Sequence, residues 1–354
     1  MKKKILFALA LTSLLTLASC KEEKEYLSTP ISDSQFYTGT YVKISVYDKD
    51  KEQALEDAYT VVGKAVSEIE VNEQGISELD KINNSAGDKP VKVTKGVYKL
   101  VEESVDFAKK THGAYDPAIG AVTAAWHIGF PDAHVPTDEE LAGLVKLTDY
   151  HDIKLDKEAQ TVYLEKEGMR IDLGGVGKAW LAEKAIDSLK KAGVTKAVLE
   201  FGGHTFLIGK SSSNKDGKWT IGIENPSLPI ELKADAKNSI GRITTDKSVL
   251  IETNMYARHL DVDGKIYSHL MDPKTARPYD NDLLSVIIIG DDPIEADFLS
   301  NAVYDMGLDK GLAYMNEHKD AQAILVDKEK TVYLTNGLID DVVLDKDSGF
   351  QLAN

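Results

Sequence analysis

The sequence contains one cysteine, Cys20, among its 354 residues. No internal disulfide can form, so the folded chain must be held together by its apolar core. The apolar run near the N-terminus, from Ile5 to Ala18, is too short and too interrupted by Thr and Ser to be a good membrane span. These two absences exclude a disulfide-rich scaffold and argue against a helix that crosses a bilayer.

Basic residues are too few to balance the acidic ones. The chain has 42 Lys and Arg against 58 Asp and Glu, which gives a net charge of −16 at pH 7. Such a chain repels phosphate backbones and is poorly suited to bind a membrane through a basic surface. We therefore expect no nucleic-acid partner. The sequence also lacks internal repeats, low-complexity blocks, zinc-ligand spacing and an evident Ser-His-Asp order.

The N-terminus has the pattern of a secretory signal peptide: three lysines, an apolar run and small residues. It ends in "LASC", which resembles a bacterial lipobox; the alternative is a plain signal peptide followed by a chance cysteine. We predict a signal peptide over residues 1–19, lipid attachment at Cys20, a polar tether over 20–35 and one folded domain over 36–354. The lipid would anchor the protein to a membrane of the bacterial cell envelope, outside the cytoplasm.

Helical and β-like segments alternate along the rest of the chain. "TYVKISVY" alternates apolar and polar residues, as a half-buried strand does. Apolar residues recur at helical spacing in "KEQALEDAYTVVGKAVSEIE" and "KGVYKLVEESVDFAKK", and "TDEELAGLVKL" predicts another helix. Short β-like runs follow in "TVYLEKE", "MRIDLG", "AVLEFGG" and "KWTIGI", with a helix predicted over about 178–191.

The C-terminal part continues this mixture. "KIYSHLM" is β-like, and "LLSVIIIG" is apolar enough to be a central strand. Asp292-Pro293 forms an N-cap and first-turn pair that opens a helix through "IEADFLSNAVYDMG". "AQAILVD" and "TVYLTN" read as strands. We expect one intertwined α/β unit with mixed α+β character rather than two separable domains.

Two glycine pairs could expose backbone to a ligand. "RIDLGGVGKAW" passes through Gly174-Gly175 toward a helix, where N–H groups favour an anion; the alternative is a tight turn that needs glycine for backbone reasons alone. It is not a Walker A loop, because Asp172 occupies the place of the first glycine and Ala179 follows the lysine. The pair in "EFGGHTFLIG" could likewise approach a ligand or merely turn a hairpin.

Polar residues of two further segments are candidates for a site. Asp297 and Asn301 are four residues apart on one helix face and offer hard oxygen suited to Mg²⁺ or Ca²⁺; a lone helical Asp is more often a solvated charge. His269 and Asp272 in "IYSHLMDPKTARP" could lie at the mouth of a site or belong to a proline-bounded turn. "HGAYDPAIG" is ambiguous by itself.

Taken in order, these segments resemble the FAD:protein FMN transferases of the ApbE family. The chain has "TGTYVKI", "SELDKIN", "GAYDP", "DLGGVGKAW", "FGGH", "ETN", "HLMDPKTARP" and "ADFLSN" where the family has similar motifs. The resemblance covers nearly the whole chain after the tether. It implies a T-fold-related α/β architecture that holds FAD in a cleft with Mg²⁺ at the pyrophosphate. The implied reaction hands FMN to a Thr or Ser hydroxyl of an exported flavoprotein and releases AMP.

The resemblance also implies roles for particular residues. His269 would lie near the reacting phosphate in a proton-handling or positioning role, with Asp297 as the second catalytic residue. Metal ligands would come from the main chain of Gly175, from Asp297, and from Ser300 or Asn301. The residues implied in binding the flavin nucleotide are Thr38, Ala114, Tyr115, Asp116, Asp172, Lys178 and Met271.

Several family motifs are altered in this chain. Thr38 replaces a Met, Ala179 and Ala276 replace glycines, "ETN" replaces T-S-G, and Asn301 replaces the metal-binding Thr. The aromatic residue that usually precedes "SELDKIN" is also missing. Two alternatives to a transferase therefore stay open: a flavin-binding lipoprotein without catalysis, and an FAD pyrophosphatase that yields FMN and AMP.

Overall fold

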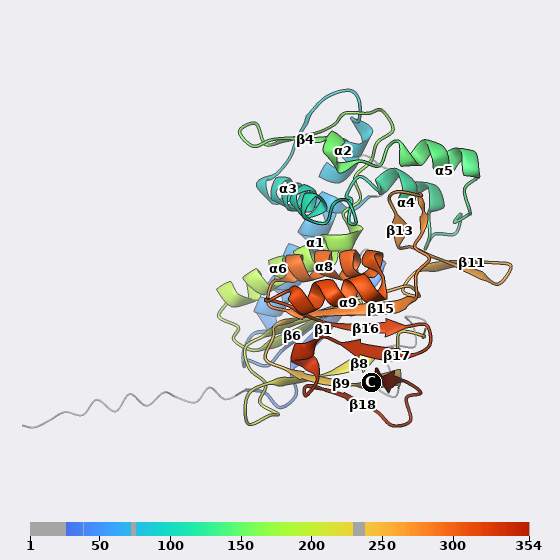
Figure 1. Cartoon of the computed structure of the whole chain (residues 1–354). Coiled ribbons are helices and arrows are strands. Elements are labelled where there is room, and N and C mark those ends of the chain that lie inside the picture. Colours follow the sequence, from blue (N-terminus) through green and yellow to red (C-terminus); the bar gives the residue numbers. More distant parts are fainter. Residues whose placement is uncertain (1–25, 38, 72–75, 229–237, 354) are drawn as a thin grey trace, which may run out of the picture.

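The computed structural model describes residues 26–37, 39–71, 76–228 and 238–353 (Figure 1). Thr38, Cys20 and the predicted signal peptide lie outside these residues. Within them, no helix is long and apolar enough to cross a membrane.

The centre of the molecule is a large, almost entirely antiparallel sheet. In the described part of the chain, nine strands lie in the order β1-β2-β6-β7-β10-β15-β16-β17-β19. Only the last pair is parallel. The strands are β1 (Ile31–Tyr37), β2 (Thr40–Val46), β6 (Ala197–Phe201), β7 (His204–Ile208), β10 (Val249–Asn254), β15 (Leu283–Gly290), β16 (Gln322–Asp327), β17 (Thr331–Leu334) and β19 (Gln351–Leu352).

Both faces of this sheet are covered. On one face lie α1 (Glu52–Ile69), α6 (Gly174–Lys191), α8 (Pro293–Met306) and α9 (Leu308–Glu317), drawn above the strands in Figure 1. On the other lies a small sheet in which β9 (Ser239–Thr245) pairs with β8 (Trp219–Glu224) and β18 (Val342–Leu344). The strand β15 is buried along its whole length. Its side chains alternate between two cores: Val286 and Ile288 pack in the core on the helix side. Ile287 and Ile289 pack in the core between the two sheets.

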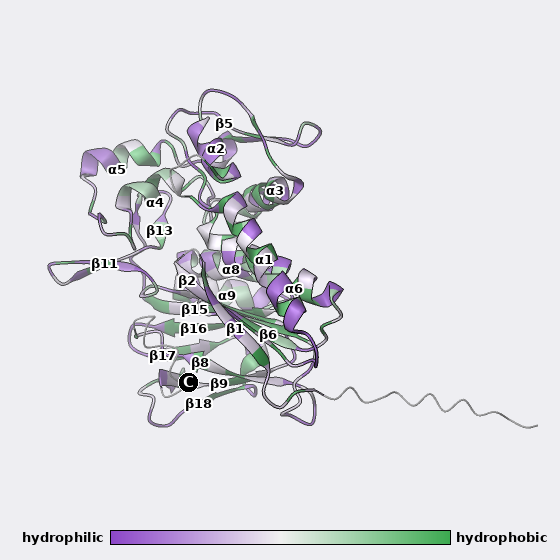
Figure 2. Cartoon of the chain, turned by 180° about the vertical axis from the view of Figure 1, so that it is seen from behind, coloured by the Kyte–Doolittle hydropathy of each residue, from purple (hydrophilic) through white to green (hydrophobic). Residues whose placement is uncertain are grey.

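A smaller group of elements lies beyond the helix layer (Figures 1 and 2). Its described residues form four helices, one three-stranded sheet and two hairpins. A small apolar cluster surrounds Trp126 and Met271. Its helices are α2 (Glu78–Asn84), α3 (Lys95–Lys110), α4 (Gly120–Trp126) and α5 (Asp138–Val145). Its strands are β3 (Val91–Lys92), β4 (Ile153–Asp156), β5 (Thr161–Leu164), β11 (His259–Val262), β12 (Lys265–Ser268), β13 (Met271–Asp272) and β14 (Arg277–Pro278).

Strongly periodic segments were predicted correctly, and three predictions need correction. The tether over residues 20–35 is too long, because β1 begins at Ile31 and the Leu27 N–H donates to the Tyr47 carbonyl over 2.8 Å. The strand expected in "MRIDLG" is reduced to a single bridge between Arg170 and Ile119. The helix expected from residue 178 begins at Gly174. The local sequence did not predict β1 or the start of α6, because β1 is a polar edge strand without apolar alternation and the first turn of α6 is rich in glycine.

Candidate active site

The segment before α6 is fixed by side chains from distant elements. Asn83 of α2 accepts from the Ile171 N–H (2.7 Å) and donates to the Ile171 carbonyl (3.1 Å). The Asp172 N–H donates to the Pro117 carbonyl over 2.9 Å. These bonds replace a strand ladder and hold the chain in the orientation from which α6 starts. They give the "SELDKIN" motif a structural role.

The Asp172 carboxylate closes the turn at the start of α6. Its Oδ1 accepts from the Gly174 N–H over 2.7 Å, and its Oδ2 accepts from the Thr123 hydroxyl over 2.7 Å. Gly174 is exposed and Gly175 half-buried. The Val176 and Gly177 N–H groups donate to the Leu173 carbonyl, so an anion at this turn would meet the Gly175 N–H and the positive end of the helix dipole, where a phosphate is favoured. Asp172 is half-buried and bonded within the turn.

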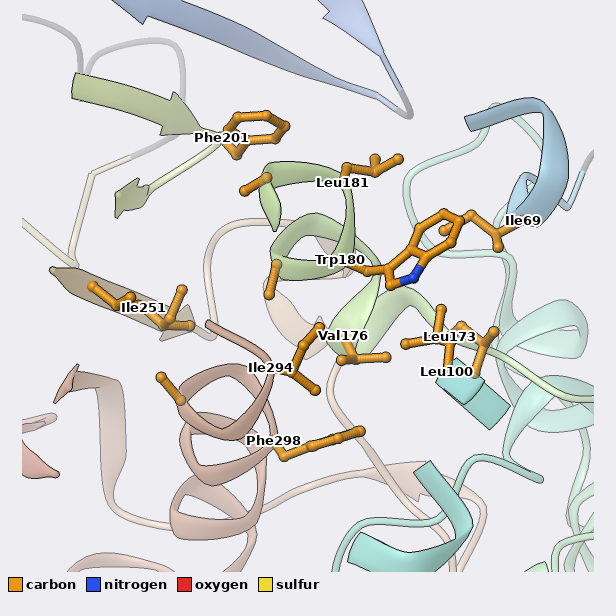
Figure 3. Packing of buried hydrophobic residues seen from close by; sticks show 14 of the residues in the cluster. Ile69, Leu100, Leu173, Val176, Trp180, Leu181, Phe201, Ile251, Ile294 and Phe298 are labelled. Carbon is orange, nitrogen blue, oxygen red and sulfur yellow. The ribbon is translucent and has the colours of Figure 1, made fainter. Parts of the chain in front are cut away.

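Helix α8 brings two of the predicted metal ligands to this turn. Its N-terminus is set by Asp292, which accepts from the Glu295 N–H, and by Pro293 in the first turn, as predicted. Apolar side chains of α6 and α8, among them Val176 and Phe298, then pack in one cluster (Figure 3). This packing fixes the two helices side by side.

Asn301 joins the two helices directly. Its Nδ2 donates to the Gly175 carbonyl over 3.0 Å and to the Asp297 carbonyl over 2.9 Å. The structure therefore brings Gly175, Asp297 and Asn301 together, as predicted from the family motifs. Ser300 is fully buried; its hydroxyl donates to the Asp297 carbonyl (2.8 Å) and lies 2.7 Å from that of Thr253. The Ser300 hydroxyl thus links α8 to β10, which leaves Asn301 as the better-placed ligand.

A histidine that sequence reasoning missed lies beside Asp297. The Nε2 of His204 is 3.4 Å from Asp297 Oδ1, and the two side chains are only 1% and 3% exposed. His204 is the first residue of β7, directly after the Gly202-Gly203 turn. The only sequence signal was that glycine pair, because nothing local indicates which face the histidine enters.

The half-buried Lys178 lies in the same environment as the buried His204. Burial lowers the pKa of Lys178, while the Asp297 carboxylate acts in the opposite direction. Burial, and then the charge of Lys178, lower the pKa of His204. The imidazole is therefore neutral near pH 7. Lys178 lies close enough to the Asp297 carboxylate for their charges to interact, and its predicted contact with the flavin nucleotide stays a prediction.

His269 is held by the main chain of Arg258, a second residue that the sequence analysis did not single out. The Arg258 carbonyl lies 3.0 Å from His269 Nδ1 and 3.1 Å from the His269 N–H. Because a carbonyl can only accept, Nδ1 carries the proton and Nε2 keeps its lone pair. Burial, with the charges of Arg258 and Lys178, lowers the pKa of His269 to about 3. His269 is therefore a neutral base held in one tautomer.

The turn between β1 and β2 approaches Arg258 as well. A Cβ atom on Gly39 would lie 2.9 Å from the Arg258 Nη2, and one on Gly202 would lie 2.2 Å from the Thr40 hydroxyl. The "TGT" and "FGG" motifs are thus close neighbours, since only glycine permits such approaches. The remaining member of the first motif, Thr38, lies outside the described residues.

The side chains of "AYD" and of Met271 are used in packing. Tyr115 lies edge-on to Phe107 and Phe298. Asp116 accepts from two main-chain N–H groups, and burial raises its pKa to about 6. Met271 lies in the apolar cluster of α4. A nucleotide contact from these residues, or from Ala114, would therefore come from the main chain, and it stays a prediction.

The described residues contain no group of three His, Cys, Asp or Glu that could hold a metal ion. Asp297 is the only carboxylate in the predicted ligand set, and the Gly175 carbonyl and the Asn301 amide are neutral oxygen donors. Such a set fits a hard divalent cation that takes its other ligands from phosphate and water. Two surface hollows, of about 610 and 480 Å³, are lined by none of the site residues named above.

Comparison with known proteins agrees with this arrangement of motifs. The sequence matches the ApbE family over residues 38–325. The chain belongs to the ApbE family. It is 30% identical over 330 residues to the FAD:protein FMN transferase of Treponema pallidum (strain Nichols), which covers 89% of each chain. It is 28% identical over 312 residues to that of Klebsiella pneumoniae (strain 342), covering 86% of this chain and 94% of the relative.

Solved ApbE structures share the fold. The crystal structure of the ApbE protein of Thermotoga maritima superposes with a TM-score of 0.77 at 26% identity, over 87% of this chain and 97% of that one. The flavin transferase ApbE of Vibrio cholerae gives a TM-score of 0.72 at 23% identity, over 88% and 98%. The mixed α/β, ApbE-like fold expected from the sequence is confirmed.

Proposed function

We propose that this ApbE-family protein is an FAD:protein FMN transferase that uses Mg²⁺ and modifies a Thr or Ser hydroxyl of an exported protein. The observation that carries the proposal is the meeting of Asp297, Asn301 and the start of α6 at Gly175. An anion-binding helix turn beside a single carboxylate and neutral oxygens suits a metal-bound pyrophosphate. The names of the curated relatives support FAD as the donor and a protein as the acceptor.

The transfer needs few groups from the protein. The acceptor oxygen forms a bond to the phosphorus of the FMN half, and the bond from that phosphorus to the bridging oxygen breaks, so that AMP leaves with the bridging oxygen. The hydroxyl proton goes to a base. His269 is suited to this because its Nε2 keeps a lone pair at neutral pH. A bound Mg²⁺ would neutralise charge on the pyrophosphate.

The chain's own residues would position the substrate. The Gly175 N–H at the start of α6 would bind a phosphate oxygen, and Lys178, close to Asp297, adds a further donor. Asp297, Asn301 and the Gly175 carbonyl would hold the cation. Arg258 fixes the tautomer of His269 through its carbonyl. In-line transfer depends on positioning and charge neutralisation more than on covalent chemistry by the enzyme.

We also propose that the protein is exported and anchored by a lipid on Cys20, so that its acceptor is an exported flavoprotein. Support comes from the signal pattern and "LASC" in the sequence. If the protein acts as a transferase outside the cytoplasm, FAD and the acceptor protein must both be present there. The identity of the acceptor depends on surfaces of both proteins.

One assay separates transfer from its two alternatives. Purified protein is incubated with FAD, Mg²⁺ and a candidate acceptor domain, followed by flavin fluorescence of the acceptor in a denaturing gel and by AMP detection. A fluorescent acceptor with equimolar AMP supports transfer. AMP without labelled acceptor in every acceptor tried would favour an FAD pyrophosphatase. Bound FAD with neither product would favour a non-catalytic flavin-binding lipoprotein.

A further inference from the structure

His204 is a buried polar side chain without a hydrogen bond to the part of the chain that the structure describes. It is 1% exposed, and neither ring nitrogen has a hydrogen-bond partner among the described residues. Leaving such groups unpaired costs about 1–3 kcal/mol each. A buried histidine with two unpaired nitrogens beside a buried carboxylate therefore indicates a ligand that binds between or next to them.

The distance between the two side chains points to the nature of that ligand. Nε2 of His204 and Oδ1 of Asp297 are 3.4 Å apart, which is longer than a good N–H···O bond of about 2.7–3.2 Å. A cation that binds a nitrogen and an oxygen at about 2.1 Å each separates these donors by about 3.0 Å in octahedral and about 3.4 Å in tetrahedral geometry. The pair is thus spaced as two ligands of one ion.

The fold holds His204 in this position. The Gly202-Gly203 turn, with φ values of +54° and +89°, joins β6 to β7 so that His204 lies opposite Phe201. Asp297 is fixed from the other side by α8, where its carbonyl accepts from Ser300 and Asn301. Neither element can shift without disturbing the core, so the donors are preorganised.

We propose that His204 is a nitrogen ligand of the cation that binds at Asp297, and that it gives this site a preference for first-row transition metals over Mg²⁺. The proposal rests on the proposed function, because the same cation would bridge to the FAD pyrophosphate. Imidazole nitrogen suits Fe²⁺ and Zn²⁺ better than it suits Mg²⁺, which prefers oxygen, and Mn²⁺ is the first and weakest-binding member of the same first-row series. The remaining ligands would be the Gly175 carbonyl, the Asn301 amide, phosphate oxygens and water.

The direct test is pulsed electron paramagnetic resonance of Mn²⁺ bound with FAD to the full protein. Protein labelled with ¹⁵N-histidine distinguishes a histidine ligand from the nitrogens of FAD. We expect a ¹⁵N coupling to Mn²⁺ in the labelled wild type, its loss in His204→Gln, and its retention in His269→Gln, the matched variant of the other histidine of the site. Labelled wild type without a ¹⁵N coupling overturns the proposal, as does a coupling that persists in folded His204→Gln.

A binding measurement gives an independent readout. FAD affinity is measured by flavin fluorescence with saturating Mn²⁺ or Mg²⁺. The wild type should bind FAD at least about tenfold more tightly with Mn²⁺, and His204→Gln or His204→Asn should reduce this ratio toward one. Equal affinities with both ions in the wild type overturn the metal preference while leaving the transferase proposal intact. Absence of FAD binding with either ion contradicts the proposed function itself, so the two failures are distinguishable.

Discussion

At the scale of single residues, Asp297 carries the only full negative charge among the oxygen ligands proposed for the cation. Its side chain is 3% exposed, and Mg²⁺ releases water reluctantly, so this site should bind the ion weakly until a nucleotide adds phosphate oxygens. Metal and FAD should therefore bind cooperatively. Sequence reasoning predicted this set of residues correctly as neighbours because family motifs fix their order, but it could not supply their distances.

Asp297→Ala should abolish the effect of Mg²⁺ on FAD affinity, because it removes the only carboxylate of the set. Asn301→Thr restores the family residue and should leave the effect intact or strengthen it, since a hydroxyl oxygen replaces an amide oxygen. Titration of FAD by flavin fluorescence, with and without Mg²⁺, measures all three proteins. A wild type whose FAD affinity ignores Mg²⁺, with Asp297→Ala indistinguishable from it, would remove the metal site and favour the non-catalytic binder.

His269 makes stability depend on pH. It takes up a proton near pH 6.5 when unfolded but only near pH 3 when folded. Between these pH values the unfolded chain binds more protons than the folded chain. The contribution of His269 to the free energy of unfolding is therefore fully present above pH 6.5 and is lost as the pH falls toward 3, by up to about 1.4 kcal/mol per pH unit. The lowered pKa of His204 acts in the same direction, and the raised pKa of Asp116 opposes it.

Urea unfolding between pH 7 and pH 4 tests this expectation. His269→Gln should lose part of the wild-type slope between pH 6.5 and 4, because glutamine does not titrate. His112→Asn is the control, since His112 is exposed and its φ of +51° suits asparagine. Identical slopes in wild type and His269→Gln would contradict the neutral state of this half-buried histidine.

At the scale of elements, the β13–β14 hairpin contains a residue in an unusual backbone conformation. Ala276, which the sequence analysis placed where the family motif has glycine, adopts φ +55° while fully buried. Its carbonyl accepts from Trp126 Nε1 over 2.8 Å, which ties the hairpin to α4. Ala276 therefore adopts a backbone conformation for which glycine is better suited.

Ala276→Gly should alter the free energy of unfolding by less than about 1 kcal/mol. Glycine would relieve the strain of the left-handed conformation, which is worth about 1–2 kcal/mol. Two losses offset this gain: the buried methyl group contributes about 0.8 kcal/mol, and the greater freedom of the unfolded glycine chain costs about 0.4–1 kcal/mol. Ala276→Val should destabilise by more than about 2 kcal/mol, because a β-branched residue fits neither the positive φ nor the packed space. Urea denaturation compares them; a Val variant as stable as wild type would refute the strained turn.

Other elements show why local sequence was an incomplete guide. The helices α1 and α3 were predicted from apolar periodicity, which depends only on neighbours along the chain. The polar strand β1 was read as tether because one of its sides is the edge of the sheet and its side chains are largely exposed. The start of α6 was placed four residues late because glycine disfavours helix by itself, whereas Asp172 and Asn83 stabilise the turn through contacts made in the folded state.

At the scale of the whole molecule, the described fold begins close to the proposed lipid. Tyr26 already packs on the domain, with Lys196 Nζ 3.7 Å from its ring centroid. The six residue steps between Cys20 and Tyr26 can span at most about 20 Å. A lipid on Cys20 would therefore keep the domain near the membrane surface, and an acceptor would have to present its hydroxyl there.

Cys20→Ala should move the protein from the membrane pellet to the soluble fraction of the cell envelope, because no described helix could replace the lipid as an anchor. Fractionation followed by immunoblotting measures this, with Ser19→Ala as a control that leaves the cysteine in place. If Cys20→Ala stays in the membrane pellet, the lipobox interpretation is wrong.

The sequence by itself determined the family, the order of its motifs and most of the regular elements, because these depend on residue identity and local periodicity. It also determined that Asp297 and Asn301 share a helix face. Only the tertiary structure decided that His204 lies against Asp297 and that the Arg258 carbonyl fixes His269. These pairs join strands and helices far apart in the chain, and the burial that sets their distances and pKa values exists only once the sheet and helices have packed together.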